Sequence, residues 1–154
     1  MKTFLTALVF AGLALPAGDP PGFHMWTSAE LKAFSKSLSP KVDAQKVATQ
    51  PLASNANYLF AIAHREGPGQ AEWHETQADV FFVESGSAIL LLGGRLVNGE
   101  TVGPHEKRNG QIVGGVRRAI SAGDVVRIPP RVPHQLLLNG AKEFNYFVVK
   151  IKGY

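Results

Sequence analysis

The stretch EWHETQADVFFVESG, residues 72–86, gathers three potential metal ligands just ahead of an apolar run that ends at a glycine. Side chains two residues apart share a face of a β-strand, so Glu72 and His74 are expected to point the same way and Trp73 the opposite way. Asp79 begins the apolar run, and a turn through residues 75–78 can bring it back toward the pair. The pattern predicts a strand with a polar site at its entrance.

Short β-prone runs of this kind recur along the rest of the chain, separated by glycine, proline, asparagine or aspartate. Regular short strands with such turn signals indicate an all-β sandwich or barrel. Several runs are apolar at successive positions, so both faces must be covered, one by the barrel interior and the other by an N-terminal helix, a second sheet or a partner chain. The predicted strands are residues 57–64, 78–85, 87–94, 124–130, 134–140 and 144–151.

The first 17 residues have the features of a secretory signal peptide. One lysine precedes an apolar run that ends near proline and alanine, and the run is shorter than the roughly 20 apolar residues that span a bilayer. We therefore predict export to the periplasm or the extracellular space, with no membrane attachment once the signal is removed.

A linker rich in proline and glycine leads from this segment to a predicted amphipathic helix. Thr27 and Glu30 have the spacing of a capping box, and residues 41–50 can add further helical turns before Pro51. The predicted organisation is a signal peptide at 1–17, a linker and helical segment at 18–56, and a barrel at 57–154.

Length and composition exclude several other classes of protein. The 154 residues suit one domain with a real core, and the lack of cysteine excludes disulfides and thiolate metal sites. The net charge is +4, but the basic residues are scattered and cluster only as the pairs at 107–108 and 117–118. This distribution argues against nucleic-acid binding.

A second stretch, SAGDVVRIPPRVPHQLLL at residues 121–138, supplies another candidate ligand. Its three prolines fix the backbone on the approach to His134. A rigid backbone before a lone imidazole suits a ligand whose position matters.

The stretch at 72–86 resembles the first motif of the cupin superfamily, G-x5-H-x-H-x3-4-E-x6-G. Glu72 stands where the family has its first histidine, His74 at the second histidine, and Asp79 at the glutamate. The closing glycine of the motif is matched in register by Gly86.

The stretch at 121–138 resembles the second cupin motif, G-x5-P-x-G-x2-H-x3-N. Gly123, Pro129 and His134 keep the frame, while Arg131 fills a glycine position and Leu138 fills the asparagine position. With its flanking strands, the resemblance covers roughly residues 57–151. It implies a small cupin of the cupin-2 conserved-barrel type, which is a double-stranded β-helix or jelly-roll barrel, here with a short N-terminal helical extension.

The resemblance also implies a metal site at one mouth of the barrel, formed by Glu72, His74, Asp79 and His134. Imidazole and carboxylate together suit Fe²⁺, Mn²⁺, Ni²⁺ or Zn²⁺. His74, Asp79 and His134 alone have the composition of a 2-His-1-carboxylate triad, in which case Glu72 is either a fourth ligand or a general base.

Other polar and aromatic side chains have more ordinary interpretations. His64 is expected to be a hydrogen-bonded structural histidine, and His105 a solvated histidine in a long hairpin or flap at 98–115. Phe81 and Val83 share a strand face with Asp79, so they are expected to line the barrel behind the site.

The fold alone does not fix the function, because cupin barrels include both enzymes and binding proteins. The leading hypothesis is an exported single-domain cupin that binds a divalent metal and acts on, or captures, a small oxygenated molecule such as a sugar or an organic acid. If it is an enzyme, the resemblance implies a dioxygenase, isomerase or lyase. The alternatives are a metal-free binding module without catalysis and, third, a structural subunit. The resemblance further suggests a homodimer.

Overall fold

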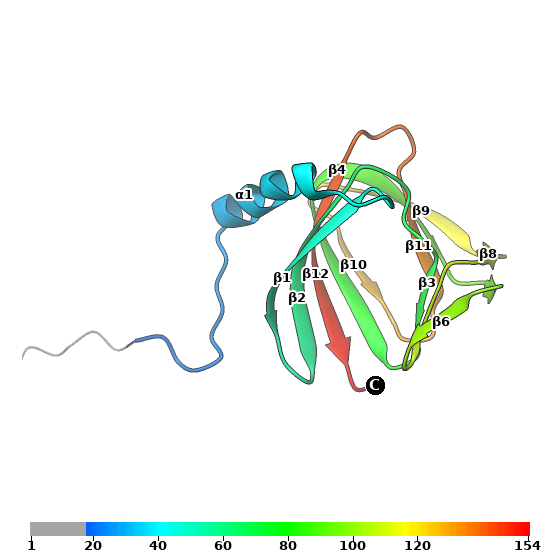
Figure 1. Cartoon of the computed structure of the whole chain (residues 1–154), viewed down its shortest axis with the longest axis horizontal. Helices are drawn as coiled ribbons and strands as arrows, with labels where there is room; N and C mark the ends of the chain where they lie inside the picture. Colours follow the sequence, from blue (N-terminus) through cyan, green and yellow to red (C-terminus); the bar gives the residue numbers. More distant parts are fainter. Residues whose placement is uncertain (1–17) are drawn as a thin grey trace, which may run out of the picture.

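One long strand joins the two sheets of the computed structural model, which describes residues 18–154 (Figure 1). This strand is β4, which spans Gln77–Leu92. Its first half pairs with β10 and β12, and its second half pairs with β9 and β11. The partner strands are β9 (Val116–Ser121), β10 (Val125–Ile128), β11 (His134–Leu137) and β12 (Phe144–Lys152). All pairings are antiparallel, and the sheet curls into a half-barrel.

Most of the remaining strands extend this sheet at both of its ends, in the order β1-β2-β12-β4-β11-β3-β7-β6. The segment predicted as a flap forms the hairpin of β6 with β7, and its strand β8 pairs with β5, just before the segment, as a separate two-stranded sheet. The bounds are β1 (Val47–Ser54), β2 (Tyr58–Arg65), β3 (Glu72–His74), β5 (Arg95–Val97), β6 (Glu100–Gly103), β7 (Glu106–Arg108) and β8 (Gln111–Val113). The predicted all-β double-stranded β-helix is confirmed.

A left-handed glycine lets β4 serve both sheets. The sequence predicts two strands, 78–85 and 87–94, but the structure has one continuous strand with Gly86 at φ 80° in its middle. Glycine adopts this conformation without steric cost, and the pairing with β12 continues up to Gly86 itself, with Glu84 as the extra residue of a β-bulge just before it.

The prediction of helical turns at 41–50 is wrong. The helix α1, Ser28–Leu38, is followed by one turn of 3₁₀ helix, η1 (Ser39–Lys41), and then by the strand β1. The sheet therefore begins at Val47, before residue 57, where the sequence placed the start of the barrel. Pro51 lies inside β1 and not at the end of a helix. It is tolerated there because β1 is an edge strand, and an edge strand accepts a residue that lacks an N–H donor.

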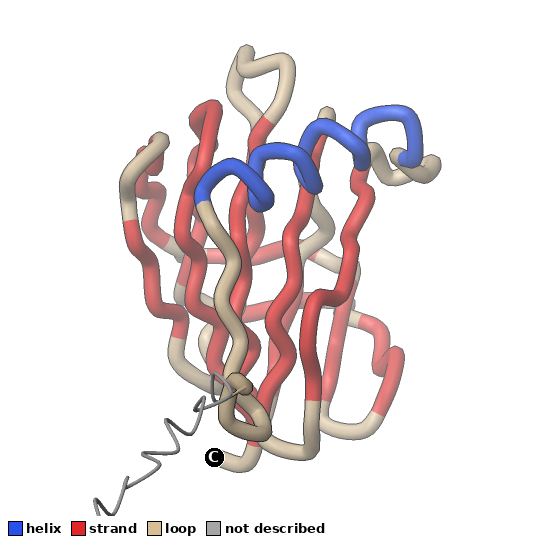
Figure 2. Tube along the Cα trace, turned by 90° about the vertical axis from the view of Figure 1, so that its left-hand side faces the viewer, coloured by secondary structure: helices blue, strands red, loops and turns tan. Residues whose placement is uncertain are grey.

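The N-terminal segment covers part of the outer face of the sheet. The capping box of α1 is present, with Thr27 and Glu30 each accepting a backbone hydrogen bond from the other, and the helix crosses one end of the outer side of the strands (Figure 2). Leu38 packs there in a cluster with Ala48 and Ile62. The helix thus covers one face of the strands that are apolar at successive positions, and it is one of the covers that the sequence predicted.

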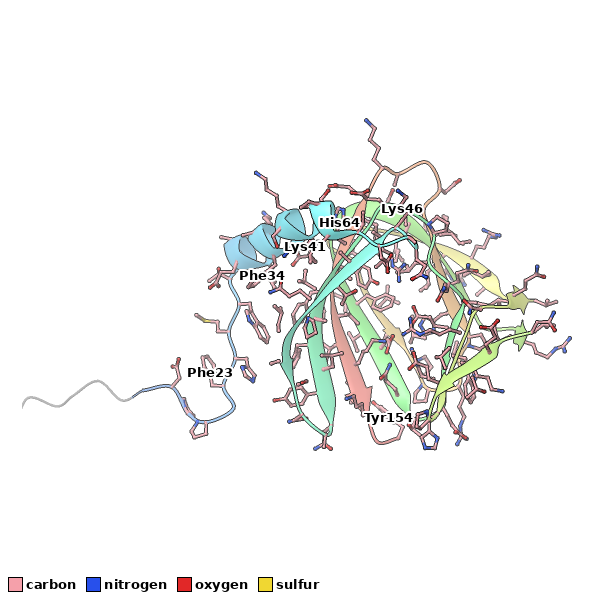
Figure 3. All side chains as sticks on the ribbon, viewed as in Figure 1. Phe23, Phe34, Lys41, Lys46, His64 and Tyr154 are labelled. Carbon is pink, nitrogen blue, oxygen red and sulfur yellow. The ribbon has the colours of Figure 1, made fainter. Side chains whose placement is uncertain are left out.

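The other face of the sheet encloses the main core (Figure 3). Phe81 and Val83 are buried there as predicted, and Phe82, which points outward, is 41% exposed. The cluster consists of Ala61, Ala63, Phe81, Val83, Ala88, Leu90, Ile120, Ile128, Leu136, Phe144, Tyr146 and Val148. The core therefore lies between the two halves of the curled sheet.

The signal peptide predicted at 1–17 lies outside the described residues. Between residues 18 and 154, the structure contains no helix that is both long enough and apolar enough to cross a membrane.

Replacing Gly86 by alanine is expected to destabilise the fold strongly. A Cβ at this position would clash with the backbone oxygen of Glu143, and the new residue would also have to adopt a left-handed conformation. The conformation alone costs about 1–2 kcal/mol. Gly93→Ala is the matched control, because Gly93 has φ 78° with nothing within 4 Å of its added Cβ. Chemical denaturation should show a larger loss for Gly86→Ala, and equal losses would contradict this account of β4.

Candidate metal centre

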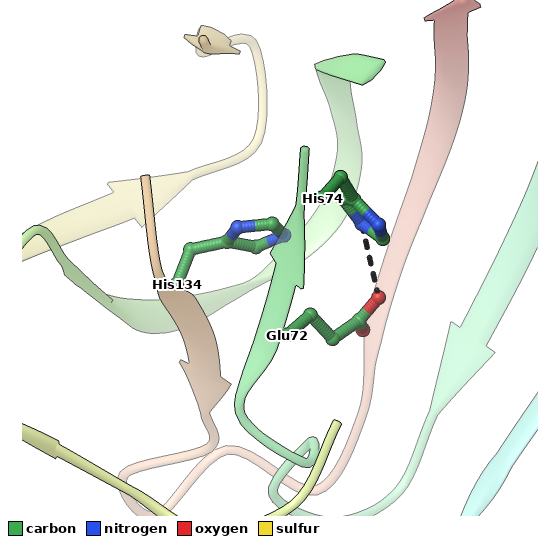
Figure 4. Close-up of side chains that lie close together, drawn as sticks. All are labelled: Glu72, His74 and His134. Atoms are coloured by element: carbon green, nitrogen blue, oxygen red, sulfur yellow. Dashed lines mark ion pairs between the residues drawn. The ribbon is translucent and has the colours of Figure 1, made fainter. Parts of the chain in front are cut away.

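Three strands bring the four predicted site residues together. Glu72 and His74 lie on β3, and His134 opens β11, directly opposite Glu72 in the ladder between these strands. Asp79 lies near the start of β4. Figure 4 shows the side chains of Glu72, His74 and His134 turned toward one another. The two-residue spacing on β3 gives Glu72 and His74 the same face, as predicted.

The ligand atoms of Glu72, His74 and His134 lie close enough to share one ion, and Asp79 lies beside both imidazoles. One ligand atom from each of Glu72, His74 and His134 lies within 4.8 Å of the others, and the two imidazole ring centres are 5.5 Å apart. Asp79 Oδ2 lies 3.6 Å from His74 Nε2 and 3.7 Å from His134 Nε2. Glu72 Oε2 lies 3.6 Å from His74 Nε2. The structure thus assembles two imidazoles and two carboxylates from distant parts of the chain.

The imidazole nitrogens that face this point are buried without a hydrogen bond. His74 Nε2 and His134 Nε2 find no hydrogen-bond partner among the described residues, and their distances to the carboxylates are too long for one. A buried polar atom left unpaired costs about 1–3 kcal/mol. Neutral imidazole nitrogen and carboxylate oxygen are ligands for divalent transition metals, so the donor set fits such an ion.

The other nitrogen of His134 orients its ring. Nδ1 lies 3.1 Å from the carbonyl oxygen of Val132, which can only accept a hydrogen bond. The proton therefore sits on Nδ1, and Nε2 keeps its lone pair toward the site. Backbone support of this kind is a common feature of metal-binding histidines.

Asp79 has two further partners inside the barrel. Lys150 Nζ, from β12, donates to Asp79 Oδ2 at 3.2 Å, and Gln77 Nε2 donates to Oδ1 at 2.8 Å. Burial alone would raise the pKa of Asp79, but its contacts with the imidazole rings of His134 and His74 and the charge of Lys150 outweigh burial and hold that pKa well below its usual range. Asp79 is therefore ionised at neutral pH.

Lys150 is the functional-site residue that sequence reasoning missed. It belongs to the apolar run 144–151, where it shares a strand face with the buried residues Tyr146 and Val148. Burial opposes its charge, but Asp79 and Glu72 together raise the pKa of Lys150. Its position on the inward face of a core strand was the available signal, because a lysine there needs a buried carboxylate.

Glu72 lies between two arginines. Its Oε1 is 3.8 Å from Arg65 of β2, and its Oε2 is 3.5 Å from Arg108 of β7. Burial would raise the pKa of Glu72, but the contact with His74 and the charge of Lys150 lower it well below the ordinary range. An ionised carboxylate with such a low pKa is a good ligand and a weak general base at neutral pH.

A cavity of about 280 Å³ lies beside these side chains. Val47 and Thr49 of the edge strand form one wall, and Arg108 forms part of the opposite side. A smaller hollow shares Val47, Arg65, Glu72 and Arg108 with the cavity. The two spaces are therefore adjacent, and of the two arginines that line both, Arg108 is the more exposed, at 37% against 9% for Arg65.

Arg131, which fills a glycine position of the cupin motif, has a backbone conformation that is typical of glycine. Arg131 has φ 64°, a left-handed conformation that glycine adopts most readily. Its N–H donates to the carbonyl oxygen of His74 at 2.7 Å, which ties the loop before His134 to β3. The turn that positions His134 thus persists without glycine.

The remaining histidines lie away from the centre. His64 is buried on the opposite side of β2, near the end of α1 (Figure 3), where its ring nitrogens contact Asn145 Oδ1 at 2.7 Å and Glu66 Oε1 at 3.1 Å. His105 is exposed and pairs with Glu75 at 2.7 Å. Both observations agree with the structural and solvated roles predicted from the sequence.

Solved structures similar to this one are cupins. No protein-family model matches the sequence, and no curated protein matches it. A conserved protein from Klebsiella pneumoniae with a double-stranded β-helix domain has a TM-score of 0.54 at 17% identity, covering 72% of this chain and 81% of its own. The cupin domain of Schizosaccharomyces pombe Cnp3 has a TM-score of 0.54 at 8% identity, covering 73% and 70%.

A cupin 2 conserved barrel domain protein from Rhodopseudomonas palustris is similar at TM-score 0.50 and 20% identity, covering 70% of this chain and 61% of its own. At these identities the likeness concerns the fold. The chain has the cupin fold, a double-stranded β-helix, and it carries a group of histidine and glutamate side chains that could hold a metal ion.

Proposed function

We propose that this cupin binds one divalent metal ion through His74, His134 and Glu72. In this proposal Asp79 is either a fourth ligand or the hydrogen-bond acceptor for Lys150. A small oxygenated molecule binds in the adjoining cavity. The observation that carries the proposal is the pair of buried Nε2 atoms without a hydrogen-bond partner within residues 18–154. When bound, a divalent ion supplies Lewis-acid polarisation of an oxygen atom.

The residues around the centre have separable tasks in this proposal. His134 is held in one tautomer by Val132, while Lys150 and Gln77 fix the orientation of Asp79. The lowered pKa of Glu72 supports its role as an anionic ligand over the role of general base. Export through a signal peptide and assembly into a homodimer stay predictions from the sequence.

A metal-free binding module is the second candidate, and one observation favours it. The ammonium group of Lys150 already lies 3.2 Å from Asp79, so this acid has a counter-ion without any metal. In such a module the same cavity would hold its ligand by hydrogen bonds and charge alone. The presence or absence of stoichiometric metal separates the two functions.

Metal analysis of protein purified without chelator is expected to find about one iron, manganese, nickel or zinc ion per chain. His74→Ala and His134→Ala should each lower the metal affinity by more than about a hundredfold, because changes even to groups that merely support a ligand cost 10–100-fold. His105→Ala is the matched control, since His105 is 58% exposed and outside the centre. Circular dichroism confirms that each variant is folded. Wild-type protein that binds no metal, or histidine variants that bind it unchanged, would overturn the proposal.

Metal affinity is also expected to rise with pH. Burial would lower the pKa of His74, but Asp79 and Glu72 raise it above its ordinary value in the metal-free protein. Only the neutral imidazole binds a metal, so protons compete below this pKa and affinity should fall about tenfold per pH unit for each proton displaced. Competition with a chromophoric chelator at several pH values measures this effect. His105→Ala should follow the same curve, and an affinity independent of pH would contradict the assignment of His74.

A further inference from the structure

The cavity beside the candidate ligands is lined by cationic side chains. Its lining contains Arg65, Arg108 and Lys150 together with the carboxylates Glu72 and Asp79, and Arg108 pairs with Glu106 outside the lining at 2.7 Å. With both imidazoles neutral these charges balance, and a divalent ion would add two positive charges. Charges interact strongly in a partly enclosed space of low dielectric constant. The cavity therefore favours an anionic occupant.

The cations keep hydrogen-bond donors for such an occupant. The Lys150 ammonium has three donors and uses one on Asp79 Oδ2. Arg65 has five N–H donors and donates from Nε to the Tyr146 hydroxyl at 3.1 Å, whereas its distance to Glu72 is 3.8 Å, beyond hydrogen-bond range. Within residues 18–154 these are the hydrogen bonds that the two side chains make. An incoming anion can therefore be bound without breaking them.

Much of the remaining cavity wall is apolar. Ala63, Phe81, Leu136 and Val148 all belong to the buried core and line the same space. At about 280 Å³ the cavity is just smaller than the range for ligand pockets, roughly 300–1,000 Å³. The wall suits a short hydrocarbon part attached to the charged group.

We infer that the ligand of this cavity is a small carboxylate. Its carboxylate group binds Lys150 and Arg65, Arg108 attracts it at the mouth, and its hydrocarbon part packs on Phe81 and Val148. A neutral sugar would leave the ammonium group of Lys150 and the guanidinium group of Arg65 without an anionic acceptor for their remaining donors. The inference rests on the proposed function for the location of the ligand, and it selects the acid over the sugar as the substrate class.

Titration of the full-length chain with isobutyrate and isobutyramide, followed by NMR, tests this assignment. The two probes have the same shape and differ in charge, so the zinc-loaded and the metal-free protein should both bind isobutyrate at least about tenfold more tightly than isobutyramide. Lys150→Met should weaken isobutyrate binding by about tenfold or more, and Lys150→Arg should retain most of it. Lys152→Met, an exposed position at the end of the same strand, should change nothing.

Any of three results would overturn the inference. The protein could bind isobutyramide as tightly as isobutyrate, it could bind glucose or inorganic phosphate more tightly than isobutyrate, or Lys150→Met could leave isobutyrate binding unchanged. Zinc content measured on the same samples keeps the two proposals apart. If zinc is still bound but the protein does not prefer isobutyrate to isobutyramide, only the carboxylate assignment is refuted. A chain that selects isobutyrate but binds no metal refutes the metal centre and supports the assignment of the cavity.

Discussion

A polar atom inside a protein core needs a partner, and this constraint governs the site. The curl of the sheet places His74 and His134 inside the barrel, where water is largely excluded and each side chain is at most 5% exposed. Their Nε2 atoms meet two carboxylates at 3.6–3.7 Å, a separation that leaves the nitrogens unbonded within the described chain. A divalent cation would satisfy these nitrogens and oxygens together, and this is the physical argument for the proposed metal centre.

The fold supplies this arrangement through one continuous strand. Because β4 pairs with strands of both sheets and continues through Gly86, its first residues bring Asp79 beside Lys150 while its last residues hold β11, which carries His134. The carbonyl of His74 accepts the N–H of Arg131, so β3 and the loop before His134 are fixed to each other. The same inward face then continues into a cavity that is lined by the cations Arg65, Arg108 and Lys150.

Much of this follows from the sequence, because alternation along a strand fixes which side chains share a face. That rule places Glu72 with His74, and Phe81 and Val83 with Asp79, and the motif spacing adds His134. The sequence alone could not place the cationic side chains beside the acids, because the register between β12 and β4 decides that Lys150 lies opposite Asp79. Pro51 misled the prediction because proline ends a helix but also fits an edge strand, and only the tertiary sheet order shows that β1 is at the edge. Continuity of β4 through Gly86 likewise depends on β12 as a partner for the bent strand.

Anomalous diffraction from crystals of the zinc-loaded protein is the decisive measurement for the metal centre. We expect a single strong peak within metal-bonding distance, about 2.0–2.2 Å, of both His74 Nε2 and His134 Nε2, with a carboxylate oxygen of Glu72 or Asp79 completing the contact. A barrel interior without a peak at this point, or a peak bound by neither imidazole, would contradict it.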